Sequence, residues 1–157
     1  MNNFSAFTCK ANGILNQLRT KVYIHSDSCT QFPDKSNEWD ALWDTGATNS
    51  CISHRIVSDL NLVPDGMKTM YSATHEVTVN TYTVDIMLPN KVTINDVLVS
   101  EMNLKDCDLL IGMDIIKYGD FSVTNFDGNT SFSFRIPSIK HIDYVEEANN
   151  MKKALKL

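Results

Sequence analysis

Polar and apolar residues alternate along much of the first two-thirds of this chain, and such alternation is typical of β-strands with one buried face. The longest run, Val77–Leu88, is long enough to form two pieces of one bent strand. Shorter runs at Lys21–His25 and Val92–Val99 predict two more strands, and Pro89 and Asn90 predict the turn before the second of them. The pattern therefore indicates a domain built mainly from strands.

Helical spacing before the C-terminus is confined to two short segments. Ser53 is expected to cap a helix over His54–Leu60. Asp114–Tyr118 is expected to form a single helical turn that Gly119 ends, with Asp114 as its cap.

The last third of the chain predicts a hairpin. Phe121–Phe126 and Thr130–Ile136 flank Asp127-Gly128-Asn129, which is a strong signal for a turn between two strands. Its phenylalanines are suited either to the core or to a contact between two chains, and both interpretations stay open.

After Pro137, apolar residues recur at steps of three and four from Ile139 to Leu157, which predicts an amphipathic terminal helix. We expect this helix to cover the sheet; pairing with a second copy and binding a partner protein are the alternatives. The expected division is a β domain over residues 1–137 and a helical extension over residues 138–157.

Composition and charge narrow the functional classes. The 157 residues fit one domain, and a net charge of -5 without a basic stripe argues against binding nucleic acid. The apolar runs are too short to span a membrane, and the first residues do not resemble a secretory signal, so we expect a cytoplasmic protein with reduced thiols. The four cysteines are scattered without a Cys-x-x-Cys pair, so neither zinc nor another metal cofactor is expected.

The triplet Asp44-Thr45-Gly46 carries the clearest chemistry, because an apolar strand leads directly into the acid. A metal site would need more ligands, and Asp40 is the acid that lies nearby. A serine nucleophile would need a Gly-x-Ser-x-Gly turn, which the sequence lacks. A pair of carboxylates that share one proton remains, in which one acid serves as base and the other as acid.

Two segments together resemble the retropepsin-like aspartic protease family, in its bacterial and retroelement members. They are Asp44-Thr45-Gly46-Ala47-Thr48 and Leu109-Leu110-Ile111-Gly112-Met113-Asp114, within a similarity that runs from about Val22 to about Ile136. The resemblance implies a mainly β, acid-protease barrel or sandwich. It implies that Asp44 is one half of a catalytic dyad, that Thr45 bonds to the neighbouring loop across a dimer, and that Gly46 brings its N–H to the carboxylate. Leu109–Gly112 is then the strand that supports the catalytic loop.

The chain contains one such triplet, so the resemblance implies a homodimer in which Asp44 faces its twin across a two-fold axis. The expected function is an endopeptidase that hydrolyses polypeptide substrates through an activated water, without a cofactor. The alternatives are a catalytically inactive peptide-binding member of the fold and an assembly protein.

The resemblance also implies a flap, for which the best candidate spans about Met70 to Thr83. Thr74 and His75 near its tip, together with Ala47 and Thr48, are the expected substrate contacts, with a solvated hairpin residue as the alternative for His75. No glycine lies between Gly66 and Gly112, whereas retroviral members have a glycine-rich tip.

The ion pair that retroviral members use near the catalytic loop is a further difference, because its two positions hold Thr48 and Met113. Both charges are missing together, so neither is left unpaired. Trp43, just before the acid, is expected to point away from the cleft into the core.

Overall fold

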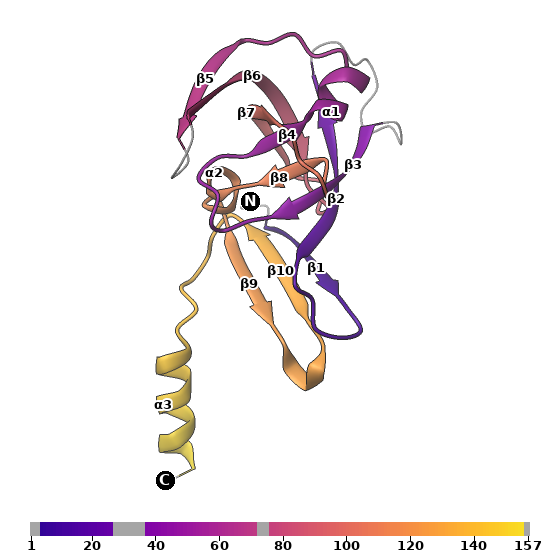
Figure 1. Ribbon diagram of the computed structural model, residues 1–157. Coiled ribbons are helices and arrows are strands. Elements are labelled where there is room, and N and C mark those ends of the chain that lie inside the picture. Colours follow the sequence, from indigo (N-terminus) through magenta and orange to yellow (C-terminus); the bar gives the residue numbers. More distant parts are fainter. Residues whose placement is uncertain (1–3, 27–36, 72–75, 156–157) are drawn as a thin grey trace.

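Strands dominate the computed structural model, which describes residues 4–26, 37–71 and 76–155 (Figure 1). The strands are β1 (Ser5–Lys10), β2 (Leu18–His25), β3 (Glu38–Trp43), β4 (Cys51–Ser53), β5 (Gly66–Tyr71), β6 (Glu76–Met87), β7 (Thr93–Met102), β8 (Leu109–Ile111), β9 (Asp120–Thr124) and β10 (Ser131–Ile136). The helices are α1 (His54–Asp59), α2 (Met113–Ile116) and α3 (Tyr144–Ala154), with a 3-10 turn, η2, at Phe126–Gly128.

The larger sheet has the strand order β2-β3-β8-β4-β7-β6-β5, and β2 also pairs with β6, so the sheet curls back on itself. The alternation in β6 is confirmed: Tyr82, Val84 and Ile86 are all buried. A register shift between Val84 and Ile86 interrupts the pairing with β7, and such an irregularity accounts for the expected bend.

Helix α1 also follows the sequence pattern. The Ser53 side chain accepts a hydrogen bond from the Ile56 N–H, and Ile56 is fully buried against the sheet. The helix thus begins where its cap predicts and ends at Asp59, one residue before Leu60.

A smaller sheet, in the order β1-β10-β9, packs on the first through aromatic side chains. Trp43 is buried, as expected, and its ring centroid lies 5.2 Å from that of Phe132 and 5.0 Å from that of Phe134. The hairpin is confirmed, and Phe132 and Phe134 belong to the core. Phe126, at its tip, is 87% exposed.

The expected flap corresponds to the hairpin of β5 and β6, whose register pairs Met67 with Asn80 and Thr69 with Thr78. Its first strand begins at Gly66 rather than near Met70. The tip, with Thr74 and His75, lies outside the described residues.

The expectation that the terminal helix covers the sheet is wrong. Helix α3 begins only at Tyr144, and it projects away from both sheets (Figure 1). Every described residue from Pro137 onward is exposed. The inner face of β10 is already filled by Phe132 and Phe134, which pack on Trp43, so that face leaves no apolar surface for a helix to cover.

Candidate active site

Asp44 lies directly after β3, and the neighbouring strand fixes its backbone. β3 pairs in parallel with β8, which places Trp43 beside Ile111, and the Asp44 N–H donates to the Ile111 carbonyl at 2.9 Å. Leu109 and Ile111 are fully buried, so β8 is a firm support. The acid therefore emerges from the core at a defined point and is itself half-buried.

A tight turn orients the carboxylate. The Gly46 N–H donates to Asp44 Oδ1 at 2.8 Å, and the Ala47 N–H donates to the Asp44 carbonyl at 3.2 Å. The first of these contacts is the one that the resemblance implied for Gly46. One carboxylate oxygen is thus held by the chain's own backbone.

Thr45 and Thr48 are exposed and Ala47 is half-buried. In the part of the chain that the structure describes, no side-chain hydrogen bond involves the Thr45 hydroxyl. The carbonyls of Ala47 and Thr48 accept from the N–H groups of Met113 and Asp114, at 2.8 and 3.2 Å. Two of the expected substrate contacts therefore already use their backbone to hold the loop onto α2.

Gly112 allows the loop 44–50 to pass close to β8. A Cβ at this position would lie 2.8 Å from the Asn49 carbonyl carbon and 2.9 Å from the Ala47 oxygen. Its φ of -96° suits any residue, so the reason for glycine here is space.

Ser50 and Asp114 close the loop from the other side. The Ser50 N–H donates to Asp114 Oδ2 at 2.8 Å, and the Ser50 hydroxyl donates to Asp114 Oδ1 at 2.7 Å. The same hydroxyl accepts from the Gly112 N–H at 3.1 Å. The expectation that Asp114 caps a helical turn over Asp114–Tyr118 is wrong: α2 spans Met113–Ile116, with Gly112 as its N-cap and no side-chain cap hydrogen bond. The Asp114 carboxylate instead holds Ser50, and it also accepts from the Ile115 N–H at 3.0 Å.

Nothing in the residue pattern singles out Ser50, because its partners lie 62 and 64 positions away in sequence. The Ser50–Asp114 contact lies beside Thr48, whose carbonyl accepts from the Asp114 N–H at 3.2 Å. The loop is thus fixed inside one chain by a carboxylate and a hydroxyl.

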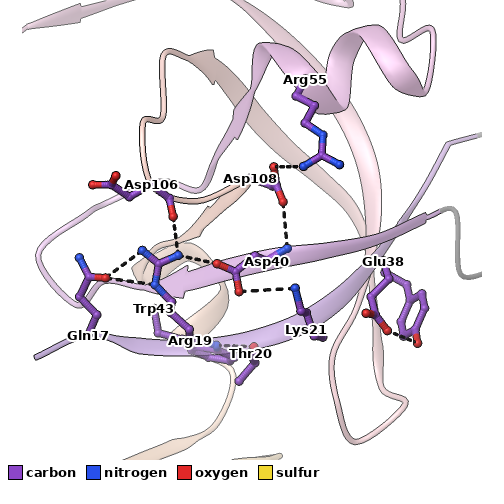
Figure 2. Close-up of polar contacts among 11 residues, drawn as sticks. Gln17, Arg19, Thr20, Lys21, Glu38, Asp40, Trp43, Arg55, Asp106 and Asp108 are labelled. Atoms are coloured by element: carbon purple, nitrogen blue, oxygen red, sulfur yellow. Dashed lines mark hydrogen bonds and ion pairs between the residues drawn. The ribbon is translucent and has the colours of Figure 1, made fainter. Parts of the chain in front are cut away.

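Asp40, the acid nearest to the triplet in sequence, belongs to a separate network (Figure 2). Its carboxylate binds Arg19 at 2.5 Å, and the Arg19 guanidinium also donates to the Asp106 carbonyl and to Gln17. Asp108 accepts from the Asp40 N–H at 3.2 Å and from Arg55 at 3.3 Å. These contacts tie β2, β3 and the start of β8 together, so Asp40 stabilises β3, the strand that leads into Asp44.

The rear of the flap hairpin is fixed to the body by Glu101. Its carboxylate accepts from Tyr82 at 2.8 Å and Asn80 at 3.1 Å, both on β6, and contacts His54 Nδ1 at 2.6 Å. Burial alone would raise the pKa of Glu101, but the hydrogen bonds from His54, Tyr82 and Asn80 outweigh it and lower that pKa. Burial and the bond to Glu101 raise the pKa of Tyr82 to about 12.

Two other kinds of chemistry find no support near Asp44. Burial, with Asp114 nearby, raises the pKa of the Cys51 thiol to about 11, so this thiol is protonated at neutral pH and is a poor nucleophile. In residues 4–26, 37–71 and 76–155, no group of three or more His, Cys, Asp or Glu side chains is placed to hold a metal ion.

None of the helices described is long and apolar enough to cross a membrane.

An open pocket of about 390 Å³ adjoins the acid. Leu42, Trp43, Phe121 and Val123 form its apolar part, and Asn16 and Gln17 lie at its border with Asp44 and Thr45. A carboxylate beside an apolar surface is suited to act on a group held by apolar contacts.

Comparison with solved structures shows a retropepsin-like fold. The retropepsin-like aspartic protease from Rickettsia conorii matches with a TM-score of 0.56 and 11% identity, over 87% of this chain and 98% of that one. The EIAV protease in complex with the inhibitor HBY-793 matches with a TM-score of 0.50 and 16% identity, over 68% of this chain and 90% of that one. At these identities the likeness concerns the fold alone.

No curated protein sequence matches the chain significantly. The model of one protein family, described as gag-polyprotein putative aspartyl protease, matches residues 35–118, which is more than half of the chain and includes both Asp44 and Gly112. The chain therefore belongs to the gag-polyprotein putative aspartyl protease family.

Proposed function

We propose that this protein is a homodimeric aspartic endopeptidase in which Asp44 of each chain supplies one carboxylate of the catalytic dyad. The observation that carries the proposal is the geometry of Asp44 itself: a half-buried carboxylate at the end of a core strand, with one oxygen held by Gly46 N–H at 2.8 Å. One chain provides one such acid, so the dyad needs a second copy.

In this mechanism the two carboxylates share one proton, because like charges about 3 Å apart cannot both ionise. The ionised carboxylate takes a proton from a water molecule as the water attacks the scissile carbonyl. The protonated carboxyl gives its proton to the carbonyl oxygen, which forms a gem-diol. The carboxyl that took the proton from water then gives it to the nitrogen as the C–N bond breaks, while the other carboxylate takes a proton from the gem-diol, so the dyad again holds one proton.

Substrate is proposed to lie as an extended strand between the flap hairpin and the loop 44–50. Ala47 and Thr48 on the loop and Thr74 and His75 on the flap are the proposed contacts.

The proposed catalytic unit is residues 1–137, with residues 138–157 as an extension. A reducing, cytoplasmic setting is proposed because Cys9, Cys51 and Cys107 are all free thiols.

The test compares wild type with Asp44→Asn on a pooled peptide library between pH 4 and 7. The isosteric amide cannot act as the base, so we expect cleavage to fall by about 10³-fold or more. Sedimentation and circular dichroism should show both proteins as folded dimers. Cleavage that survives unchanged in the variant, or a wild type that cuts nothing, contradicts the proposal.

A further inference from the structure

Helix α3 presents an apolar stripe that nothing in the described chain covers. Tyr144, Met151 and Leu155 are 60%, 57% and 69% exposed, and Ala148 is exposed between them. These four residues follow one another at steps of four, three and four, which is the spacing of the seam of a two-stranded coiled coil.

The helix is well marked at its ends but short. Asp143 caps it by accepting from the N–H groups of Val145 and Glu146, at 2.9 and 3.1 Å, and lysines occupy its last turn. An isolated helix of this length is only marginally stable in water, and α3 stands clear of both sheets (Figure 1). Its stability therefore calls for a partner along the apolar stripe.

The charges beside the stripe identify that partner. In the heptad set by the stripe, Glu147 occupies a g position and Lys152 the following e position. Within the helix, the residues three and four positions after Glu147 are Asn150 and Met151, so no lysine meets it there. In a parallel, in-register pair of helices, a g residue faces the e residue five positions on in the other helix, which is Lys152.

We propose that α3 pairs in parallel with α3 of a second copy of this chain, with Tyr144, Ala148, Met151 and Leu155 as the seam and Glu147 facing Lys152 of that copy on each side. The two-fold axis of such a pair makes each contact occur twice. An antiparallel pair would set g against g and e against e, so Glu147 and Lys152 would not meet.

A membrane surface is a poorer match for the helix. Its charged residues are two glutamates and two lysines, whereas helices that lie on membranes carry a mainly basic polar face. The balanced charges suit a second helix of the same sequence.

The pairing does not depend on catalysis, but its axis is compatible with the proposed enzyme. A two-fold axis through the seam is the symmetry that the Asp44 dyad requires. So short a coiled coil is weak alone, but when joined to a body that also dimerises it acts as an intramolecular second contact and raises the overall affinity.

The test is a charge-exchange cycle in the full chain carrying Asp44→Asn, read by equilibrium sedimentation at low salt. Glu147→Lys and Lys152→Glu alone should each weaken dimerisation about tenfold, because each places like charges across the seam twice. The double exchange should restore the affinity to within about threefold. An equimolar mixture of the two single variants should form heterodimers, since every facing pair is then opposite in charge.

Glu146→Lys and Lys153→Glu are the matched controls. They make the same changes of charge one residue away, at positions that face solvent, and Glu146 borders the same groove against Lys140–Asp143 as Glu147 does. Each should change the affinity by less than about twofold.

A monomeric protein, equal effects of the Glu146 and Glu147 reversals, or a double exchange without recovery would each overturn the pairing. Cleavage is measured separately, in the same variants with Asp44 intact. If the double exchange restores dimerisation but the protein with Asp44 intact cleaves no peptide, the proposed function is refuted and the helix pairing stands. If the protein cleaves peptides but the double exchange does not restore dimerisation, the helix pairing is refuted and the proposed function stands.

Discussion

Gly112 shows how a single hydrogen atom in place of a side chain positions the loop 44–50 that carries Asp44. The backbone of residues 47–49 passes so close that no Cβ fits, while Ser50 and Asp114 hold the loop in contact. The carboxylate of Asp44 is oriented within this loop, so its direction depends on residues that do no chemistry.

We expect Gly112→Ala to displace the loop and to reduce both stability and activity. The added methyl meets backbone atoms at 2.8 and 2.9 Å, and backbone cannot rotate away as a flexible side chain can. A loss of about 2–3 kcal/mol in the free energy of unfolding is the expected scale for forced overpacking. Urea unfolding and peptide cleavage measure the two effects.

Gly66→Ala is the control for this change. Its Cβ would lie 3.4 Å from Thr81 Oγ1, an ordinary contact, and Gly66 does not pack on the backbone of residues 47–49. Near-normal stability is expected there. If Gly112→Ala behaved like Gly66→Ala, the close approach at Gly112 would not position the loop.

The sequence predicts some of these residues and not others for a physical reason. Asp44 and Gly46 interact across two positions, so a local pattern reveals them. Ser50 meets Gly112 and Asp114 only after β3, β8 and β4 have come together in the sheet. A serine before a buried strand carries no local sign of such partners.

At the scale of elements, the sequence predicts individual strands and helices but does not predict how they pack on one another. Period-two alternation predicts β6 and β7, and the Ser53 cap predicts α1. The short β1, Ser5–Lys10, is not among the predicted strands: Phe7 and Cys9 alternate with Thr8 and Lys10 over only four residues, and its place is fixed by pairing with β10. The spacing of α3 predicts a helix but does not reveal whether the sheet still has a free face to receive it.

The exit of the chain from the smaller sheet is fixed by Asp120 at the start of β9. Its carboxylate accepts from the Ser138 hydroxyl at 2.5 Å, from the Ile139 N–H at 2.9 Å and from the Arg135 Nε at 3.0 Å. The hydrogen bonds from Ser138 and Ile139, followed by the Arg135 guanidinium, hold the pKa of Asp120 well below its usual range. One side chain therefore joins β9, β10 and the segment that leads to α3.

We expect Asp120→Asn to lower the free energy of unfolding at pH 7 by about 1–2 kcal/mol, the scale of a hydrogen bond to a charged group. Because the folded-state pKa is lowered, the wild-type advantage is complete above the unfolded pKa of about 3.9 and is lost as the pH falls through the folded value. The difference between the two proteins should be constant from pH 5 to 7 and shrink below about pH 4.

Denaturant unfolding at pH 7, 5 and 3 measures this dependence. Asp127→Asn, at the exposed hairpin turn of the same sheet, removes one charge without removing a comparable set of bonds and should have little effect. Equal losses in both variants, or a difference that does not shrink in acid, would show that Asp120 stabilises in another way.

At the scale of the whole molecule, the proposed dyad would make dimerisation part of the active site, because each chain supplies a single Asp44. Thr45, the residue after Asp44, is exposed, and the pocket that Asp44 and Thr45 line with Phe121 and Val123 is open to solvent. The proposed pairing of α3 supplies a second contact outside the sheets. Both features concern a second copy: the count of triplets indicates it for the proposed dyad, and the heptad spacing with Glu147 and Lys152 indicates it for α3.

Mixing wild type with Asp44→Asn distinguishes a shared dyad from an acid that acts alone. If both carboxylates are required and subunits exchange freely, an equimolar mixture contains about one quarter fully wild-type dimers. Its cleavage rate should then be about one quarter of the rate of pure wild type at the same total protein concentration. An enzyme whose chains act independently would retain about one half. The cleavage rate after the subunits have re-equilibrated decides between the two. A mixture diluted below the dissociation constant of the dimer should lose further activity, because the dimers that carry the dyad separate.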